Sequence, residues 1–264
     1  MPDLRVRQAR WYSRRVDFDP PQPMGPPVAL PPAILPLDRL AAAFEVLLCS
    51  GYPTQLIISA FLVAFGLRPE GAGGELSARF VYALSLLDTV LVVALVVFFF
   101  HARGESWRDE LFGRLSPARD VMLGIVIVPA SFFLITLVLV ILQIVAPWLR
   151  NVPHNPLAGL AKTRTDAVIL GFVVMVAGGV REEVQRGFVL RRFEQYLGGG
   201  LVGLAIFSVA FGLGHFTQGR DVVVGTAILG AFWGAIFLAR RSILAPMIGH
   251  AGFNLAQIVK FVLT

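Results

Sequence analysis

The chain has few charged residues and a single cysteine, and both scarcities exclude classes of protein. Charged residues make up 15% of its 264 residues, whereas a soluble domain usually has about 25%. Together with a hydrophobic content of 56% and a mean hydropathy of +0.73, this excludes disorder and argues against an ordinary soluble enzyme. The lone cysteine, Cys49, excludes a disulfide framework and a cysteine-based zinc site.

Three motifs of hydrolases are also missing. The sequence contains no His-Glu-x-x-His zinc motif, no Gly-x-Ser-x-Gly nucleophile turn and no Gly-x-Gly-Asp motif. Any hydrolytic chemistry in this chain must therefore use another arrangement of side chains.

The charge that is present is mostly arginine. The formal net charge is +6 and the pI is about 10.2, with 21 arginines and 2 lysines. In so apolar a chain, arginine is typical of loops anchored at a bilayer, and we expect no nucleic-acid partner. Residues 1–37 combine basic residues with eight prolines between Pro20 and Pro36, which predicts an extended, basic, proline-rich cytoplasmic tail.

Apolar stretches of membrane-spanning length follow this tail. A crossing helix needs about 20 apolar residues, and this criterion predicts an all-α, polytopic transmembrane bundle with about seven to eight membrane helices. We expect N-terminal transmembrane helices in residues 38–150 and a C-terminal catalytic helix bundle in residues 160–264. The candidate spans are 41–67 (interrupted at Gly51 and Pro53), 80–100, 121–145, 166–181, 201–216, 222–239 and 243–263.

Loop charge predicts the orientation. If the tail lies inside, the arginines of residues 103–119, 191–192 and 240–241 also lie inside. The opposite loops hold fewer basic residues. Because Lys and Arg are enriched in cytoplasmic loops, we expect a multi-pass protein of the cell inner membrane with a cytoplasmic N-terminus.

Polar residues at membrane depth concentrate in three C-terminal segments, at residues 181–186, 211–215 and 250–254. A charged side chain there costs roughly 2.5–3.5 kcal/mol on insertion scales, so such residues by default indicate a functional site. Helical rise places Glu182, His215, His250 and Asn254 about 12–21 Å from the inner ends of their helices, within one slab.

Each segment has a simpler interpretation. Residues 181–186 could form a solvated, salt-bridged cytoplasmic helix. His215 could make a helix-to-helix hydrogen bond, and His250 and Asn254 could be packing contacts. Glu45 and Asp88, in the first two spans, are expected to make interhelical or interfacial polar contacts. The combination of three segments in order is what favours a functional site.

The side chains of these segments suit hydrolysis. A carboxylate in a low-dielectric site can act as a general base on water. Imidazole and asparagine side chains can donate hydrogen bonds to a developing oxyanion. These groups together fit cleavage of a peptide bond by activated water.

The same segments resemble one protein family. Glu-Glu followed by Arg-Gly-Phe, then Phe-x-x-x-His, then His-x-x-x-Asn are similar to the motifs of type II CAAX prenyl endopeptidases and of bacteriocin-immunity and lysostaphin-resistance-like proteins. These belong to the CPBP (Abi) superfamily of intramembrane proteases. The resemblance covers about residues 166–263 and implies an intramembrane endopeptidase that acts on a peptide or membrane-protein substrate in the lipid bilayer.

The resemblance also implies a role for each polar residue. A first-motif glutamate, Glu182 or Glu183, activates water together with His215. His250 and Asn254 stabilise the oxyanion. Arg186 forms a structural ion pair with the neighbouring carboxylate.

One departure from the family pattern affects these roles. The family has three residues between the glutamate pair and the arginine, whereas only Val184 and Gln185 intervene here. Counted back from Arg186, the usual catalytic glutamate falls on Arg181. We favour Glu182 as the base, with Glu183 as the alternative.

The cofactor and the activity stay open at this point. Some members of the family are described as metal-dependent, and Glu182, Glu183, His215 and His250 could hold a divalent metal such as zinc. The alternative function is a catalytically inactive membrane adaptor or bacteriocin-immunity protein on the same fold, which the Arg181 departure supports. A small-molecule transporter would need broken helices in both halves, and only Pro53 indicates one.

Overall fold

The chain is described by a computed structural model over residues 34–71, 73–113, 117–153 and 155–263. The basic, proline-rich residues 1–33 lie outside the described residues. Within the described residues the long elements are all helices, and an isolated bridge between Glu70 and Leu76 is the only β pairing, so the prediction of an all-α fold is confirmed. The elements are α1 (Pro36–Leu48), α2 (Tyr52–Ala64), α3 (Ala78–Ala102), α4 (Trp107–Phe112), α5 (Pro117–Val145), η1 (Pro147–Leu149), η2 (Pro156–Leu160), α6 (Arg164–Val174), η3 (Met175–Arg181), α7 (Glu182–Tyr196), α8 (Gly200–Leu213), η4 (Phe216–Gln218), α9 (Arg220–Arg240) and α10 (Leu244–Leu263).

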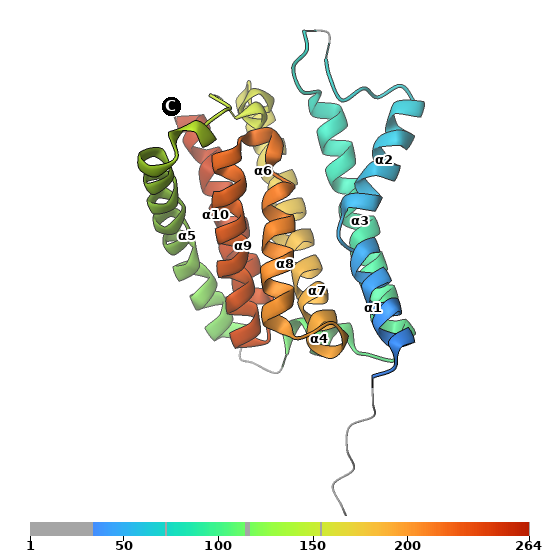
Figure 1. Ribbon diagram of the computed structural model, residues 1–264. Helices are drawn as coiled ribbons and strands as arrows, with labels where there is room; N and C mark the ends of the chain where they lie inside the picture. The colour runs from blue at the N-terminus through green and yellow to red at the C-terminus, as the bar shows by residue number, and fades with distance from the viewer. Residues whose placement is uncertain (1–33, 72, 114–116, 154, 264) are drawn as a thin grey trace, which may run out of the picture. The chain divides into compact units, whose positions relative to one another are not determined.

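The long apolar helices run between two ends of the bundle (Figure 1). One end holds α4, the start of α1 and the turn between α9 and α10, and we call it the α4 end. The other holds the connection between α5 and α6, and we call it the α5–α6 loop end. α5 packs on α10 and α9, and α8 packs on α9 and α7.

Several helices are suited to cross a membrane, as a multi-pass protein requires. Among the described residues, α3, α5 and α9 are each long and apolar enough on their own. α1 and α2 qualify as a pair, bent by 43° at the break that Gly51 and Pro53 predict. α8 is apolar but has only 14 residues, and the expectation of about seven to eight spans stays a prediction for the remaining helices.

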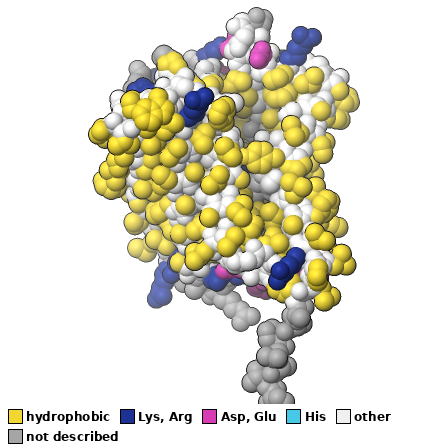
Figure 2. Space-filling model, viewed as in Figure 1, with side chains coloured by type: hydrophobic (Ala, Val, Ile, Leu, Met, Phe, Trp, Pro, Cys, Tyr) yellow, Lys and Arg dark blue, Asp and Glu magenta, His cyan; other side chains and the backbone are white. Residues whose placement is uncertain are grey.

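The outer surface of the bundle is apolar. Hydrophobic side chains cover most of the face seen in Figure 2, and arginine and lysine side chains gather at its upper and lower margins. The exposed side chains include Phe133 and Ile144 on α5 and Val90 on α3, each at least 70% exposed. An exposed apolar band between two charged margins is the surface that a bilayer requires.

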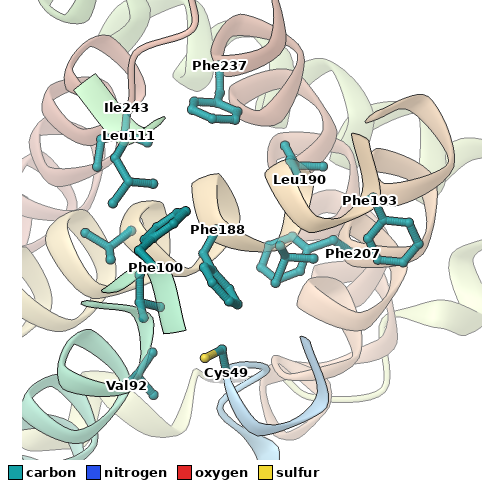
Figure 3. Close-up of a cluster of buried hydrophobic side chains, with 13 residues drawn as sticks. Cys49, Val92, Phe100, Leu111, Phe188, Leu190, Phe193, Phe207, Phe237 and Ile243 are labelled. Carbon is teal, nitrogen blue, oxygen red and sulfur yellow. The ribbon is translucent and has the colours of Figure 1, made fainter. Parts of the chain in front are cut away.

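The most charged helix is also the most buried. α7 carries two glutamates and three arginines in its first 11 residues, yet residues 183–190 are all buried. Its Phe188 lies at the centre of a hydrophobic cluster and meets Phe100 of α3 edge to face at 5.1 Å (Figure 3). α7 packs against α1, α3, α4 and α8, so these helices surround it.

Ion pairs compensate the buried charges of α7 at the α4 end. Arg192 is fully buried and donates to Glu45 of α1 at 2.6 Å and to Glu105 at 2.6 Å. Arg103 donates to the second oxygen of Glu45 at 2.7 Å. The expected interhelical role of Glu45 is confirmed, and a single carboxylate joins α1, α7 and the segment after α3.

We predict that Arg192→Met destabilises the fold. The change removes one of the two arginine partners of the buried Glu45 carboxylate and the arginine partner of Glu105, and breaking a buried pair from one side typically costs about 3–5 kcal/mol. The midpoint of thermal unfolding in detergent should fall clearly below that of the wild type. Arg119→Met, at an exposed arginine at the start of α5, is the matched control and should leave the midpoint unchanged. Equal midpoints for both variants would contradict the network.

Candidate active site

One continuous helical rod, residues 164–196, carries the first motif. α6 starts at a Thr163–Asp166 capping box, η3 follows as a π-helix, and α7 begins at Glu182. The hydrogen bonds of a π-helix run from i to i+5, so this turn changes which later residues face a given neighbour. Such turns frequently occur at functional sites, and this one ends directly before the two glutamates.

Glu183 is the buried member of the glutamate pair. Its side chain is 1% exposed, pairs with the fully buried Arg186 and accepts a hydrogen bond from Nδ1 of His250 at 2.8 Å. The guanidinium of Arg186 also lies 4.8 Å from the ring centre of Phe211. The interpretation of residues 181–186 as a solvated helix is wrong, because Arg181, Glu183 and Arg186 are all buried by packing.

Glu182 points the other way and lines a cavity. Its side chain is 19% exposed, with Oε2 at 3.7 Å from Nε2 of His250 and Oε1 at 3.6 Å from a guanidinium nitrogen of Arg181. The two glutamates thus approach the two nitrogens of one imidazole. The face of that imidazole stacks on Trp233 of α9 at 3.9 Å.

The hydrogen bonds of the imidazoles indicate where their protons lie. A carboxylate only accepts, so the 2.8 Å contact to Glu183 places a hydrogen on Nδ1 of His250. His215 donates from Nδ1 to the backbone carbonyl of Phe211 at 2.9 Å. In a neutral ring, each histidine therefore keeps Nε2 as an acceptor.

Two further residues complete the group: His215, in the turn after α8, and Asn254, on α10. The ring of Phe211 lies 5.0 Å from that of His215 and 6.2 Å from that of His250, so one aromatic ring contacts both imidazoles. Gly178 in the π-turn allows the Asn254 amide to approach: a Cβ there would collide with the amide nitrogen and lie 3.7 Å from Nε2 of His250.

A cavity of about 390 Å³ brings these groups together. Glu182, His215, His250 and Asn254 all line it, whereas Glu183 does not. The cavity extends to Asn155, Leu157 and Gln218, at the α5–α6 loop end, and its lining includes no residue of the α4 end.

From the sequence we expect a cavity that opens toward the cytoplasm, on the side of the arginine-rich loops, whereas the lining of this cavity reaches the α5–α6 loop end of the bundle. The helical rise gave the depth of the polar residues but not the side from which solvent enters. Phe188, Phe207 and Phe237 fill the α4 side of the bundle (Figure 3). The short α8 ends at Leu213, which leaves the other side to polar loop residues.

The residues proposed as metal ligands do not fit a metal site as they are arranged. Within the described residues, no three His, Cys, Asp or Glu side chains come together as a metal would need. One carboxylate oxygen of Glu183 already accepts hydrogen bonds from both Arg186 and His250.

Two contributors to the site were not predicted from the sequence. Trp233 forms the wall under His250, and its indole nitrogen donates to Ser131 of α5 at 3.1 Å. Asp88 of α3 pairs with Arg181. This pair confirms the interhelical contact expected for Asp88 and connects that residue to the site. An aspartate in an apolar span was the sequence signal for Asp88, whereas nothing in the sequence marked Trp233.

The fold and the site together define a multi-pass, all-helical membrane protein with a largely apolar cavity in which a few polar side chains of the C-terminal helices meet. Residues 164–256 match the family described as type II CAAX prenyl endopeptidase, Rce1-like. This match confirms the resemblance over the segment that builds the site, from α6 into α10. No curated protein and no solved structure matches the chain.

We predict that Arg186→Leu lowers the folded yield and the thermal midpoint in detergent. The change strands the buried Glu183 carboxylate, at a typical cost of about 3–5 kcal/mol. The double variant Glu183→Gln/Arg186→Leu removes both charges and should recover most of the loss. An Arg186→Leu protein as stable as the wild type would show that the pair contributes nothing to the fold.

Proposed function

We propose that this protein is an intramembrane endopeptidase that hydrolyses a peptide bond with water activated by Glu182. The observation that carries this proposal is the convergence of Glu182, His215, His250 and Asn254 on one cavity, from α7, the turn after α8, and α10. The family match supports protease-type activity on peptide substrates in the bilayer.

Glu182 suits the role of general base better than Glu183. It lines the cavity, and its second oxygen is directed at His250 without a hydrogen bond to it. Glu183 is held by Arg186 and His250 and has no access to the cavity. In the proposed step, Glu182 takes a proton from water as the water oxygen bonds to the peptide carbonyl carbon.

The other side chains stabilise the intermediate and move the proton. The Asn254 amide can donate to the carbonyl oxygen as it becomes an oxyanion. The proton on Glu182 can pass to Nε2 of His250, since Glu183 stabilises the resulting positive ring from its other side. The tetrahedral intermediate then collapses with cleavage of the C–N bond, and the leaving nitrogen receives the proton that came from water, either from Glu182 or from Nε2 of His250.

An inactive adaptor is the second candidate, and Arg181 is the observation that favours it. By count, this arginine replaces the first glutamate of the family pattern. We favour the enzyme because Arg181 is paired with Asp88 and Glu182 is available at the cavity.

We propose an inner-membrane location with the N-terminus and the α4 end in the cytoplasm. The α4 end carries the arginine-rich segments around residues 103–119, 191–192 and 240–241. In this orientation the cavity reaches the non-cytoplasmic side through Asn155 and Gln218. Peptide substrates would then enter from that side or from the bilayer.

We predict that Glu182→Gln abolishes proteolysis while the protein stays folded. Loss of a general base typically costs 10²–10⁴-fold in rate. The assay uses purified protein in proteoliposomes, with a fluorogenic prenylated peptide ending in a CAAX sequence and with unmodified transmembrane peptides as probes. Asp109→Asn, at an exposed carboxylate of α4, should keep wild-type activity. Cleavage at the wild-type rate by Glu182→Gln would exclude the proposed mechanism.

We predict opposite accessibility for two engineered cysteines in a Cys49→Ala background. His101 and Lys162 are exposed at the α4 end and at the α5–α6 loop end. A membrane-impermeant maleimide added to intact cells should label Lys162→Cys, and should label His101→Cys only after lysis. Labelling of His101→Cys in intact cells would reverse the orientation.

A further inference from the structure

A buried arginine beside the proposed base takes no part in the mechanism above. Arg181 is the last residue of the π-helix η3, and its side chain is 8% exposed. One terminal nitrogen pairs with Asp88 of α3, and the other lies 3.6 Å from Oε1 of Glu182. The guanidinium therefore joins α3 to the carboxylate that lines the cavity.

Asp88 is itself held by the second helix. Its Oδ1 accepts from the hydroxyl of Thr54 at 2.5 Å, and its Oδ2 accepts from the amide of Gln55 at 3.3 Å. The Asp88 side chain is 3% exposed, so α2 fixes this carboxylate away from solvent. The position of the Arg181 guanidinium is thus determined by α2 and α3, which lie outside the family-matched segment.

The break between α1 and α2 makes room for the same guanidinium. Gly51 has a φ of +82°, which side chains rarely adopt. A Cβ at this position would lie 2.5 Å from a terminal nitrogen of Arg181 and 3.3 Å from the amide of Gln185. At the bend between α1 and α2, the backbone of Gly51 therefore packs directly on Arg181.

We propose that Arg181 is a positioning residue for Glu182, anchored by Asp88, and that α2 and α3 thereby set the orientation of the base. This inference rests on the proposed role of Glu182. With one oxygen directed to Arg181, the other oxygen of Glu182 faces His250 and the cavity. An arginine at the position of the usual glutamate is thus part of the site, and the catalytic unit includes the N-terminal helices.

The test separates positioning from folding with paired charges. Arg181→Gln and Asp88→Asn each strand a buried charge and should lower the thermal midpoint. The double variant Arg181→Gln/Asp88→Asn removes both charges and should regain a midpoint near the wild type. Its kcat should stay at least about tenfold below the wild type with an unchanged KM, since a small misplacement of a catalytic group can cost about 10²-fold. Arg181→Lys should recover part of that kcat.

A double variant with a wild-type midpoint and a wild-type kcat would overturn the inference, because Arg181 would then act on folding alone. A second measurement does not depend on activity. Carbodiimide modification of Glu182, quantified by peptide mass spectrometry, should rise several-fold in the double variant, since the carboxylate has lost its guanidinium partner. An unchanged yield would also overturn the inference.

The failure of the proposed function has a different signature. If Glu182→Gln cleaves peptides like the wild type, the base assignment fails whatever the Arg181 variants do. If no variant and no wild-type protein cleaves the probes, the carbodiimide yields and the thermal midpoints still decide whether Arg181 holds Glu182.

Discussion

The structure depends on one constraint: charges buried at membrane depth must neutralise each other. Six side chains form a charged network in which each group contacts the next, in the order Asp88, Arg181, Glu182, His250, Glu183 and Arg186. This network crosses the bundle from α3 to the interior of α7. Around it, Phe207, Phe211 and Trp233 present ring faces to Arg186 at 4.8–5.6 Å, which suits a guanidinium in an apolar core. α8 and α9 pack on α7, and α10 packs on the adjoining π-helix η3, so that these helices together enclose the charged groups.

The two adjacent glutamates at the start of α7 have different surroundings. Within this helix, Arg186 could reach Glu182 at i−4 or Glu183 at i−3. Arg186 pairs with Glu183, while Glu182 is held between Arg181 and His250. The shortened spacing to the arginine is therefore compatible with a carboxylate at the cavity, because the pairing of Arg186 with Glu183 leaves Glu182 to line it.

Much of this architecture could be predicted from local sequence signals. Hydropathy placed the ends of α3, α9 and α10 within about two residues, because the lipid-facing surface must be continuously apolar. The site residues stood out because charge inside an apolar run is costly. The pairing of Asp88 with Arg181 joins residues 93 positions apart, and the side on which the cavity opens depends on aromatic packing. The π-helix had no clearer sequence signal than the Gly178–Gly179 pair. Such long-range or backbone features need coordinates.

The charge balance of this network bears on how hydrolysis could proceed without a strong base. The network contains three carboxylates and two guanidiniums, so with His250 neutral it has one negative charge in excess. A proton that water gives to Glu182 removes this excess from the network, and the negative charge moves to the attacking oxygen and then to the oxyanion that the Asn254 amide can stabilise. Because charges interact more strongly at low dielectric than in water, such a hydrogen bond is worth more in this site. A net negative charge is a cost to a purely structural network but enables this one to accept a proton from water, which favours the interpretation of the network as catalytic machinery.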